Sequence, residues 1–459
     1  MGKLLGDAFL FVTIVVLSRL FGEVGIGRYA FAIGYTGFFA VFSDYGLSTL
    51  TLKELGRDDV SVEERVNGLF TLRLLLSALV FIALVGSLRF VPIDAEDKPI
   101  VALIGAYQIL QRNFAGMYAV LVGRQKSRAA ALLYSSQYAG IALAVACVAL
   151  ISRDFLVTIA TFPAMALGQL IVSYLIVTPR LRVTSRASTL TGLYRESHAY
   201  GLGVLVAQIN SRTDIVLLGF FIGAAVSGIY GVAYQVVMLP LSIPVFVALA
   251  LLPVGSGIFA RNGAELGGLY RAALNWTSLL SIPAALGLWL IAPLAIPMVF
   301  GLGFAESVTV VRVIAIVLFL GSLSRVMSPF LFAANRQVAR TKSLWVAATV
   351  NVACNLVLIP HLGALGAALS LTISEGLLVV LFATSLRSLL GWPSIGRRVF
   401  MSTIASLAFF VPLQLLGPLP LFVVLPVAVI IYCAAISCFK EVRSNEFTTL
   451  RAALRRSSD

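Results

Sequence analysis

The stretch that decides the fold, residues 200–235, reads YGLGVLVAQINSRTDIVLLGFFIGAAVSGIYGVAYQ. It is long and apolar enough to cross a bilayer, yet Gln208, Asn210, Arg212 and Asp214 lie near its middle. Ionisable side chains at that depth are costly unless they face a partner or water. Residues two apart on a helix do not face each other, so Arg212 and Asp214 cannot neutralise one another. Each needs water in a transport pathway or, alternatively, a structural ion pair with another helix.

The composition is that of a polytopic membrane protein. Hydrophobic residues make up 59% of the chain, charged residues 12%, and the mean hydropathy is +0.99. Apolar runs of the length needed to cross the hydrocarbon core recur throughout. They predict an all-α fold of fourteen transmembrane helices, near 4–20, 29–51, 66–88, 100–123, 129–151, 155–177, 200–222, 230–254, 275–299, 306–332, 342–360, 364–386, 399–417 and 419–439.

Basic residues fix the predicted orientation. With both termini in the cytoplasm, the inner segments hold 24 of the 34 lysines and arginines, and the outer loops hold five. Loop lysines and arginines favour the cytoplasmic side, so we expect a multi-pass protein of the inner (cytoplasmic) membrane. The net charge of +14 then reflects topology and not a nucleic-acid partner.

An internal repeat predicts two lobes. GIGRYAFA, with Gly27, follows the first predicted helix, and SGIYGVAY, with Gly228, follows the seventh, 201 residues later. LVGRQKSRA at 121–129 similarly matches AANRQVART at 333–341, with a spacing of 212. Six helices per repeat predict parallel halves. We therefore expect an N-lobe (1–178), a basic cytosolic loop (179–198), a C-lobe (199–386), a helix pair (397–440) and a cytosolic tail (441–459), the tail resting on anionic lipid.

Arginines within the spans predict an anion site. Arg112 precedes Arg124 by twelve residues and Arg325 precedes Arg336 by eleven, so each lobe offers an arginine at nearly the same depth, joined by Arg212. The planar guanidinium suits phosphate, and pyrophosphate is the natural cargo. The alternative is that these arginines bond backbone carbonyls or acidic neighbours.

Polar side chains near the arginines predict sugar and ion contacts. The amides of Gln108, Gln208 and Asn210 suit sugar hydroxyls, as do Tyr134, Ser135, Gln137 and Tyr138 of the fifth predicted helix, although such residues also join helices. The carboxylates of Asp44, Asp214 and Glu375 are candidates for proton or sodium coupling. Asp44, in FSDYGLS near a helix end, could equally be a structural anchor.

Nothing in the sequence points to an enzyme or a cofactor. The two histidines, His198 and His361, have no nearby metal or nucleophile partners, and no nucleotide-binding loop or zinc motif occurs. The four cysteines lie in apolar runs without metal or disulfide spacing. We expect no metal and no catalytic residue.

Three segments resemble a known family. LSRLFGEVGIGRYAFAIGYTGFFAVFSDYGLSTLTLKELGR, TDIVLLGFFIGAAVSGIYGVAYQVV and LGALGAALSLTISEG are similar to the corresponding parts of Wzx-type polysaccharide flippases, in the multidrug, oligosaccharidyl-lipid and polysaccharide exporter superfamily. The resemblance implies two six-helix lobes around a central cationic cavity that carries an undecaprenyl-pyrophosphate-linked oligosaccharide to the periplasmic leaflet. Arg112, Arg212 and Arg325 match the family's cavity arginines in type and depth. The first helix begins short for the family, which suggests a start further upstream.

Two other functions stay open at this point. A multidrug or small-molecule cation antiporter on the same fold would favour a carboxylate-rich site, whereas three arginines stand here against Asp214 and Glu375. A polysaccharide polymerase or glycosyltransferase would need a larger outer loop than residues 89–99. Polymerases and glycosyltransferases are instead expected as partners of the pathway, beside membrane lipids and the lipid-linked glycan.

Overall fold

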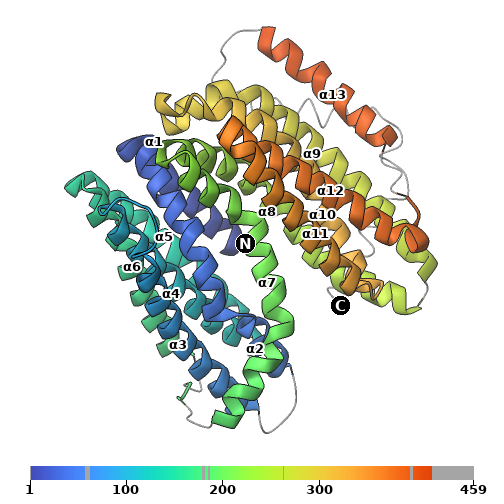
Figure 1. Cartoon of the computed structure of the whole chain (residues 1–459). Coiled ribbons are helices and arrows are strands. Elements are labelled where there is room, and N and C mark those ends of the chain that lie inside the picture. The colour runs from blue at the N-terminus through green and yellow to red at the C-terminus, as the bar shows by residue number, and fades with distance from the viewer. Residues whose placement is uncertain are drawn as a thin grey trace. The chain divides into compact units, whose positions relative to one another are not determined.

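The computed structural model describes residues 2–56, 62–177, 181–183, 187–261, 263–392 and 396–415, and within these ranges all regular structure is helical (Figure 1). The elements are α1 (Gly2–Asp44), α2 (Leu47–Leu55), α3 (Val62–Ser87), α4 (Asp97–Gly123), α5 (Ser127–Ser152), α6 (Phe155–Ile176), α7 (Ala187–Phe221), α8 (Ala224–Arg261), α9 (Gly263–Phe300), the short 3₁₀ helix η1 (Leu302–Phe304), α10 (Ser307–Ala333), α11 (Gln337–Leu362), α12 (Ala364–Leu390) and α13 (Gly396–Leu415).

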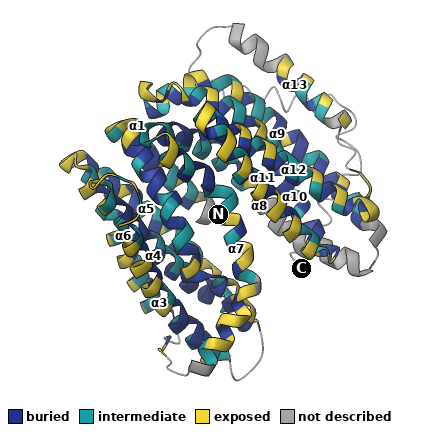
Figure 2. Cartoon of the chain, viewed as in Figure 1, coloured by how far each residue is buried: buried dark blue, intermediate teal, exposed yellow. Residues whose placement is uncertain are grey.

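Ten stretches of the described residues are long and apolar enough to cross a membrane, which makes this a multi-pass membrane protein. α4 is not among the ten, because its middle carries Gln108, Gln111, Arg112 and Asn113. The thirteenth predicted helix corresponds to α13, whereas the predicted helix at 419–439 and the tail lie outside the described residues. Exposed residues occur along α3 (Figure 2). Many exposed side chains are apolar, as helices in lipid require: Leu79 of this helix is 64% and Ile82 70% exposed.

The break predicted at 21–28 is present, and a second break lies inside the next predicted helix. α1 combines two helices that meet in a kink at Gly22, whose φ of 65° and ψ of −165° are not helical. Glycine reaches this conformation without steric cost. The predicted helix at 29–51 is in turn interrupted at Tyr45 and Gly46, with φ of 32° and 82°, and α2 begins after them. Arg19, Glu23 and Arg28 interrupt the apolar run around the first break, whereas apolar residues resume directly after the second.

The chain forms two compact units. The first comprises residues 1–232 with 359–364, and the second comprises 233–358 with 365–459. In the first, α1 packs against α3, α4, α5 and α7. In the second, α9 packs against α10 and α13, and a core that includes Tyr270, Phe330 and Phe382 is buried. The lobe boundaries predicted from the repeat stay a prediction.

The repeat appears in local backbone geometry. Gly22 and Gly223 both have positive φ, and they are 201 residues apart, as Gly27 and Gly228 are. In the first unit these segments also touch: a Cβ atom on Gly27 would collide with the carbonyl of Ala224, and one on Gly228 with the carbonyl of Glu23. The two contacts are reciprocal, because Glu23 and Ala224 hold the same place in the two copies.

The second repeat match needs a shift in register. The turn after α4 has Gln125 at φ 59° and the turn after α10 has Asn335 at φ 55°, which are 210 residues apart and not 212. The backbone hydrogen bonds agree, since Lys126 N donates to Leu121 O as Arg336 N donates to Leu331 O. Arg124 and Arg336 are therefore not equivalent positions. With a repeat spacing of 210, Arg112 corresponds to residue 322, so Arg325 lies three residues beyond the position equivalent to Arg112.

Candidate functional site

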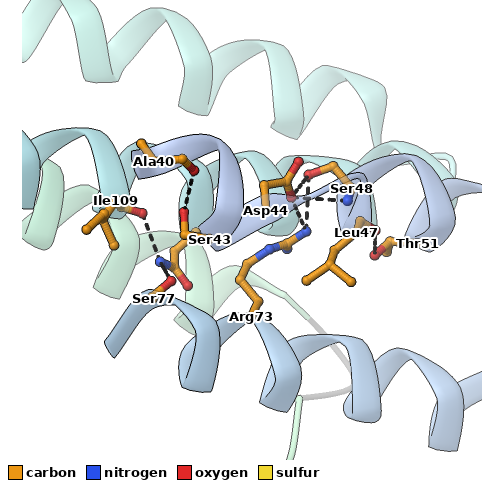
Figure 3. Close-up of polar contacts among 10 residues, drawn as sticks. Ala40, Ser43, Asp44, Leu47, Ser48, Thr51, Arg73, Ser77 and Ile109 are labelled. Carbon is orange, nitrogen blue, oxygen red and sulfur yellow. Dashed lines mark hydrogen bonds and ion pairs between the residues drawn. The ribbon is translucent and has the colours of Figure 1, made fainter. Parts of the chain in front are cut away.

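A buried ion pair closes the junction between α1 and α2. Asp44 Oδ1 accepts hydrogen bonds from Arg73 Nη2 at 2.7 Å, Ser48 Oγ at 2.7 Å and Ser48 N at 3.1 Å (Figure 3). The two side chains are 8% and 3% exposed. A buried carboxylate with three donors is a well-satisfied anchor. This geometry supports the interpretation of Asp44 as a helix-end anchor, which the sequence left open beside ion coupling.

Arg112, on α4, lies near this pair but is not part of it. Its side chain is half-buried. The charge of Asp44 attracts the guanidinium, and the charge of Arg212 on α7 repels it. Within the described residues, Arg112 makes no hydrogen bond or ion pair. The first unit thus brings together two of the three arginines predicted from the sequence, and Asp44, the nearby anion, is already bound to Arg73.

The predicted amides line the same helices. Gln108 Nε2, on α4, donates to Ile33 O at 2.7 Å and to Thr36 Oγ1 at 2.6 Å, both on α1. The Gln208 amide, on α7, approaches α1 so closely at Gly37 that a Cβ atom there would collide with it, and Gln108 Oε1 would lie 3.6 Å from that atom. Gln108 and Gln208 therefore flank one point of α1. The Oδ1 atom of Asn210 is buried and has no hydrogen-bond partner in the described part of the chain.

Asp214 is held by neutral donors. The Tyr230 hydroxyl donates to its Oδ2 atom, and the Ile215 amide donates to Oδ1 at 2.9 Å. The residue is 1% exposed. These bonds tie the end of α7 to the start of α8. The charge of Arg212 also acts on this carboxylate, although these two hydrogen bonds of Asp214 come from Tyr230 and Ile215.

The second unit contains Arg325 and Glu375. Arg325 Nη1 donates to Gly321 O of its own helix at 2.8 Å and lies 3.6 Å from Glu375 Oε1 on α12. Ser324 Oγ donates to Glu375 Oε2 at 3.0 Å. Glu375 is nearly buried, whereas the Arg325 side chain is 28% exposed. The predicted cation and the predicted coupling carboxylate are thus partners in a loose ion pair.

Sequence reasoning missed Arg73. It was one of five basic residues within the predicted spans, but 29 residues separate it from Asp44. The signal that was available is local: Asp44 and Ser48 are four residues apart beside a glycine, a spacing typical of a helix boundary. Among the described residues, no group of three histidine, cysteine or acidic side chains is placed to hold a metal ion.

Known proteins are similar to parts of this sequence. A family model described as "Polysaccharide biosynthesis protein" matches residues 1–259. The teichuronic acid biosynthesis protein TuaB of Bacillus subtilis (strain 168) is 36% identical over 129 residues, which cover 27% of this chain and 25% of that protein. The match therefore spans about a quarter of the length of this relative.

Solved structures share the fold. The lipid II flippase MurJ, in an inward closed conformation, aligns with a TM-score of 0.81 at 14% identity and covers 96% of this chain and 98% of its own. An inward-facing MATE family transporter of the MOP superfamily aligns with a TM-score of 0.67 at 13% identity and covers 85% and 95%. The chain accordingly shares the fold of these two solved structures. With more than half of its residues matched by the family model, the chain belongs to the polysaccharide biosynthesis protein family.

Proposed function

We propose that the protein flips an undecaprenyl-pyrophosphate-linked oligosaccharide across the cytoplasmic membrane by alternating access, for the synthesis of a surface polysaccharide. Arg112 and Arg212 hold the pyrophosphate, with Arg325 as a further cation on the path. Gln108, Gln208 and Asn210 contact the glycan, and the polyprenyl tail stays in lipid. Polymerases and glycosyltransferases act before and after this step. The orientation, with both termini in the cytoplasm, is part of the proposal.

The observation that carries the proposal is the pair of arginines in the first unit. Arg212 repels Arg112, and Arg112 has no hydrogen bond or ion pair among the described residues. Arg112, beside a like charge at the depth of apolar helices, is unfavourable without a counter-ion of its own. A pyrophosphate supplies two negative charges and several acceptor oxygens, which the guanidinium forks suit.

The carboxylates argue against a cationic drug as cargo. Asp44 is bound to Arg73, Asp214 to the Tyr230 hydroxyl, and Glu375 to Ser324 with Arg325 close by. A cation would have to displace these donors. An anion meets no such competition at Arg112.

Ion coupling forms the second part of the proposal. Protonation of Glu375 removes the charge that faces Arg325 across 3.6 Å, so that Arg325 becomes available to an anionic substrate. A sodium ion on the carboxylate has the same effect. Asp214, enclosed by Tyr230 and its own backbone, is the alternative coupling residue.

The experiment reconstitutes the full chain in liposomes with a fluorescent undecaprenyl-pyrophosphoryl sugar and measures its exposure to a membrane-impermeant quencher. We expect the wild type to move the lipid and the Arg112→Gln/Arg212→Gln variant to lose at least 90% of that rate, estimated from about 1.5–3 kcal/mol per charged hydrogen bond. Arg312→Gln is the matched control, because Arg312 stacks on Trp289 at 4.7 Å. Equal rates in all three proteins would refute the assignment of the arginines.

A further inference from the structure

A group of tyrosines adjoins Arg112 in the first unit. Tyr134 and Tyr138 lie one turn apart on α5, with ring centroids 4.9 Å apart, and Tyr118 of α4 packs on Tyr134 at 6.0 Å. Tyr134 and Tyr138 also share a hydrogen bond between their side chains. Both rings are half-buried, so part of each remains accessible.

This group is electrostatically connected to the arginine site. Tyr138 interacts with the charge of Arg112 and with that of Asp7 of α1. Gly6 makes the approach of α1 possible, since a Cβ atom there would lie 2.6 Å from Tyr134 Cε1 and 3.0 Å from Tyr138 Cδ2. A cation, two aromatic rings and a carboxylate thus act on one another in this part of the first unit.

Gln137 gives an independent sign of a ligand. It is 2% exposed and three residues from Tyr134, so these two side chains lie on one face of α5, and Tyr138 is the next residue of the helix. Neither its Nε2 nor its Oε1 atom has a hydrogen-bond partner among the described residues. An amide that merely joined helices would be bonded to its neighbour. Buried amides without partners are costly, and a ligand or water that supplies a donor and an acceptor removes the cost.

We propose that Tyr134, Gln137 and Tyr138 form a sugar subsite that binds the first sugar of the lipid-linked glycan, next to the pyrophosphate on Arg112. The C–H faces of a pyranose pack on aromatic rings, whose faces carry partial negative charge. Hydroxyl groups of the sugar donate to and accept from the Gln137 amide and the two phenols. This subsite rests on the proposed function and adds to it a determinant of which sugar-lipid is accepted.

The test measures the binding of two probes to the full chain in nanodiscs: undecaprenyl pyrophosphate, and the same lipid carrying one hexose. Removal of both rings by Tyr134→Ala/Tyr138→Ala should weaken the glycosylated probe about tenfold and change the bare probe less than about twofold. Arg112→Gln should weaken both probes alike. Tyr35→Ala, in α1, is the control for loss of a tyrosine elsewhere, since Tyr35 bonds Ser87.

A second variant protects the test against misfolding. Gln137→Leu keeps the volume and removes two buried polar atoms without partners, so the variant should fold at least as well as the wild type. It should still lose affinity for the glycosylated probe alone. Equal effects of the tyrosine and glutamine variants on both probes, or no effect on either, would overturn the sugar subsite. Failure of the wild type to bind either probe would instead overturn the proposed function and the subsite with it.

Discussion

Gly27 and Gly228 each face the carbonyl oxygen of the other's helix. A Cβ atom on Gly27 would collide with Ala224 O, and one on Gly228 with Glu23 O. The pairing is reciprocal because both glycines occupy the same position of the repeat, 201 residues apart. Close approach of two membrane helices through glycine is a common way to gain van der Waals contact without a hydrophobic driving force.

This contact predicts that Gly27→Val destabilises the protein. The branched side chain has no room at the carbonyl of Ala224, and overpacking of this kind costs about 1–3 kcal/mol. Thermal unfolding in detergent measures the effect. Gly168→Val is the control, since nothing lies within 4 Å of a Cβ atom at Gly168. Unchanged unfolding temperatures for both variants would show that the helices do not meet at these glycines.

Much of the fold could be predicted from local pattern. Apolar length located the helices, and the GIG and GIY segments located the two positive-φ glycines, Gly22 and Gly223, within a few residues. The corner at Tyr45 and Gly46 was missed because apolar residues resume directly after it, although Asp44, Gly46 and Ser48 together mark a helix boundary. Aligning GRQ at 123–125 with NRQ at 335–337 made the repeat spacing two residues too long, since the turn geometry aligns Gln125 with Asn335.

The sequence indicated which charged residues belong to the site, but not which residues they pair with. Buried charge pointed to Arg112, Arg212 and Glu375, because such residues are conspicuous in an apolar run. Their partners depend on packing: Asp44 pairs with Arg73 across 29 residues, and Ser324 with Glu375 across 51. Periodicity along one helix carries no information about contacts at that distance.

The Asp44 to Arg73 pair predicts an asymmetry between single and double variants. Asp44→Asn leaves a guanidinium that is 3% exposed without its charge partner, at a cost of about 3–5 kcal/mol. Replacement of both residues, as in Asp44→Leu/Arg73→Met, should cost less than Asp44→Asn alone. Chemical or thermal unfolding of the wild type and the two variants measures this, and a double variant that is as unstable as Asp44→Asn, or more so, would contradict the pairing.

The two carboxylates that bind Arg65 should differ in how much stability their loss costs. Its Nε atom donates to Glu54 at 2.6 Å and its Nη2 atom to Glu196 of α7 at 2.7 Å, and the Glu54 side chain is 0% exposed whereas that of Glu196 is 44% exposed. Glu196→Gln should cost about 0–1 kcal/mol, as exposed pairs do. Glu54→Gln should cost clearly more. Equal unfolding temperatures for the two variants would show that burial does not separate the two bonds.

Substitution of Glu375 should change the coupling of transport to an ion gradient rather than the binding of the substrate. If protonation of Glu375 releases Arg325, then Glu375→Gln should keep Arg325 permanently available and make transport insensitive to an imposed proton or sodium gradient. Transport of the fluorescent lipid in proteoliposomes, with and without a gradient, measures this. Asp214→Asn is the comparison, and a gradient response that survives in Glu375→Gln but not in Asp214→Asn would transfer the coupling role to Asp214.

The most direct test of the central claim is a titration of the full chain with undecaprenyl pyrophosphate. Arg112 and Arg212 repel one another, so an anion between them should both bind and stabilise the protein. We predict that Arg112→Gln/Arg212→Gln weakens binding about 100-fold or more, from two charged hydrogen-bonding groups, while Arg312→Gln binds as the wild type does. Wild-type affinity in the Arg112→Gln/Arg212→Gln variant would contradict the account.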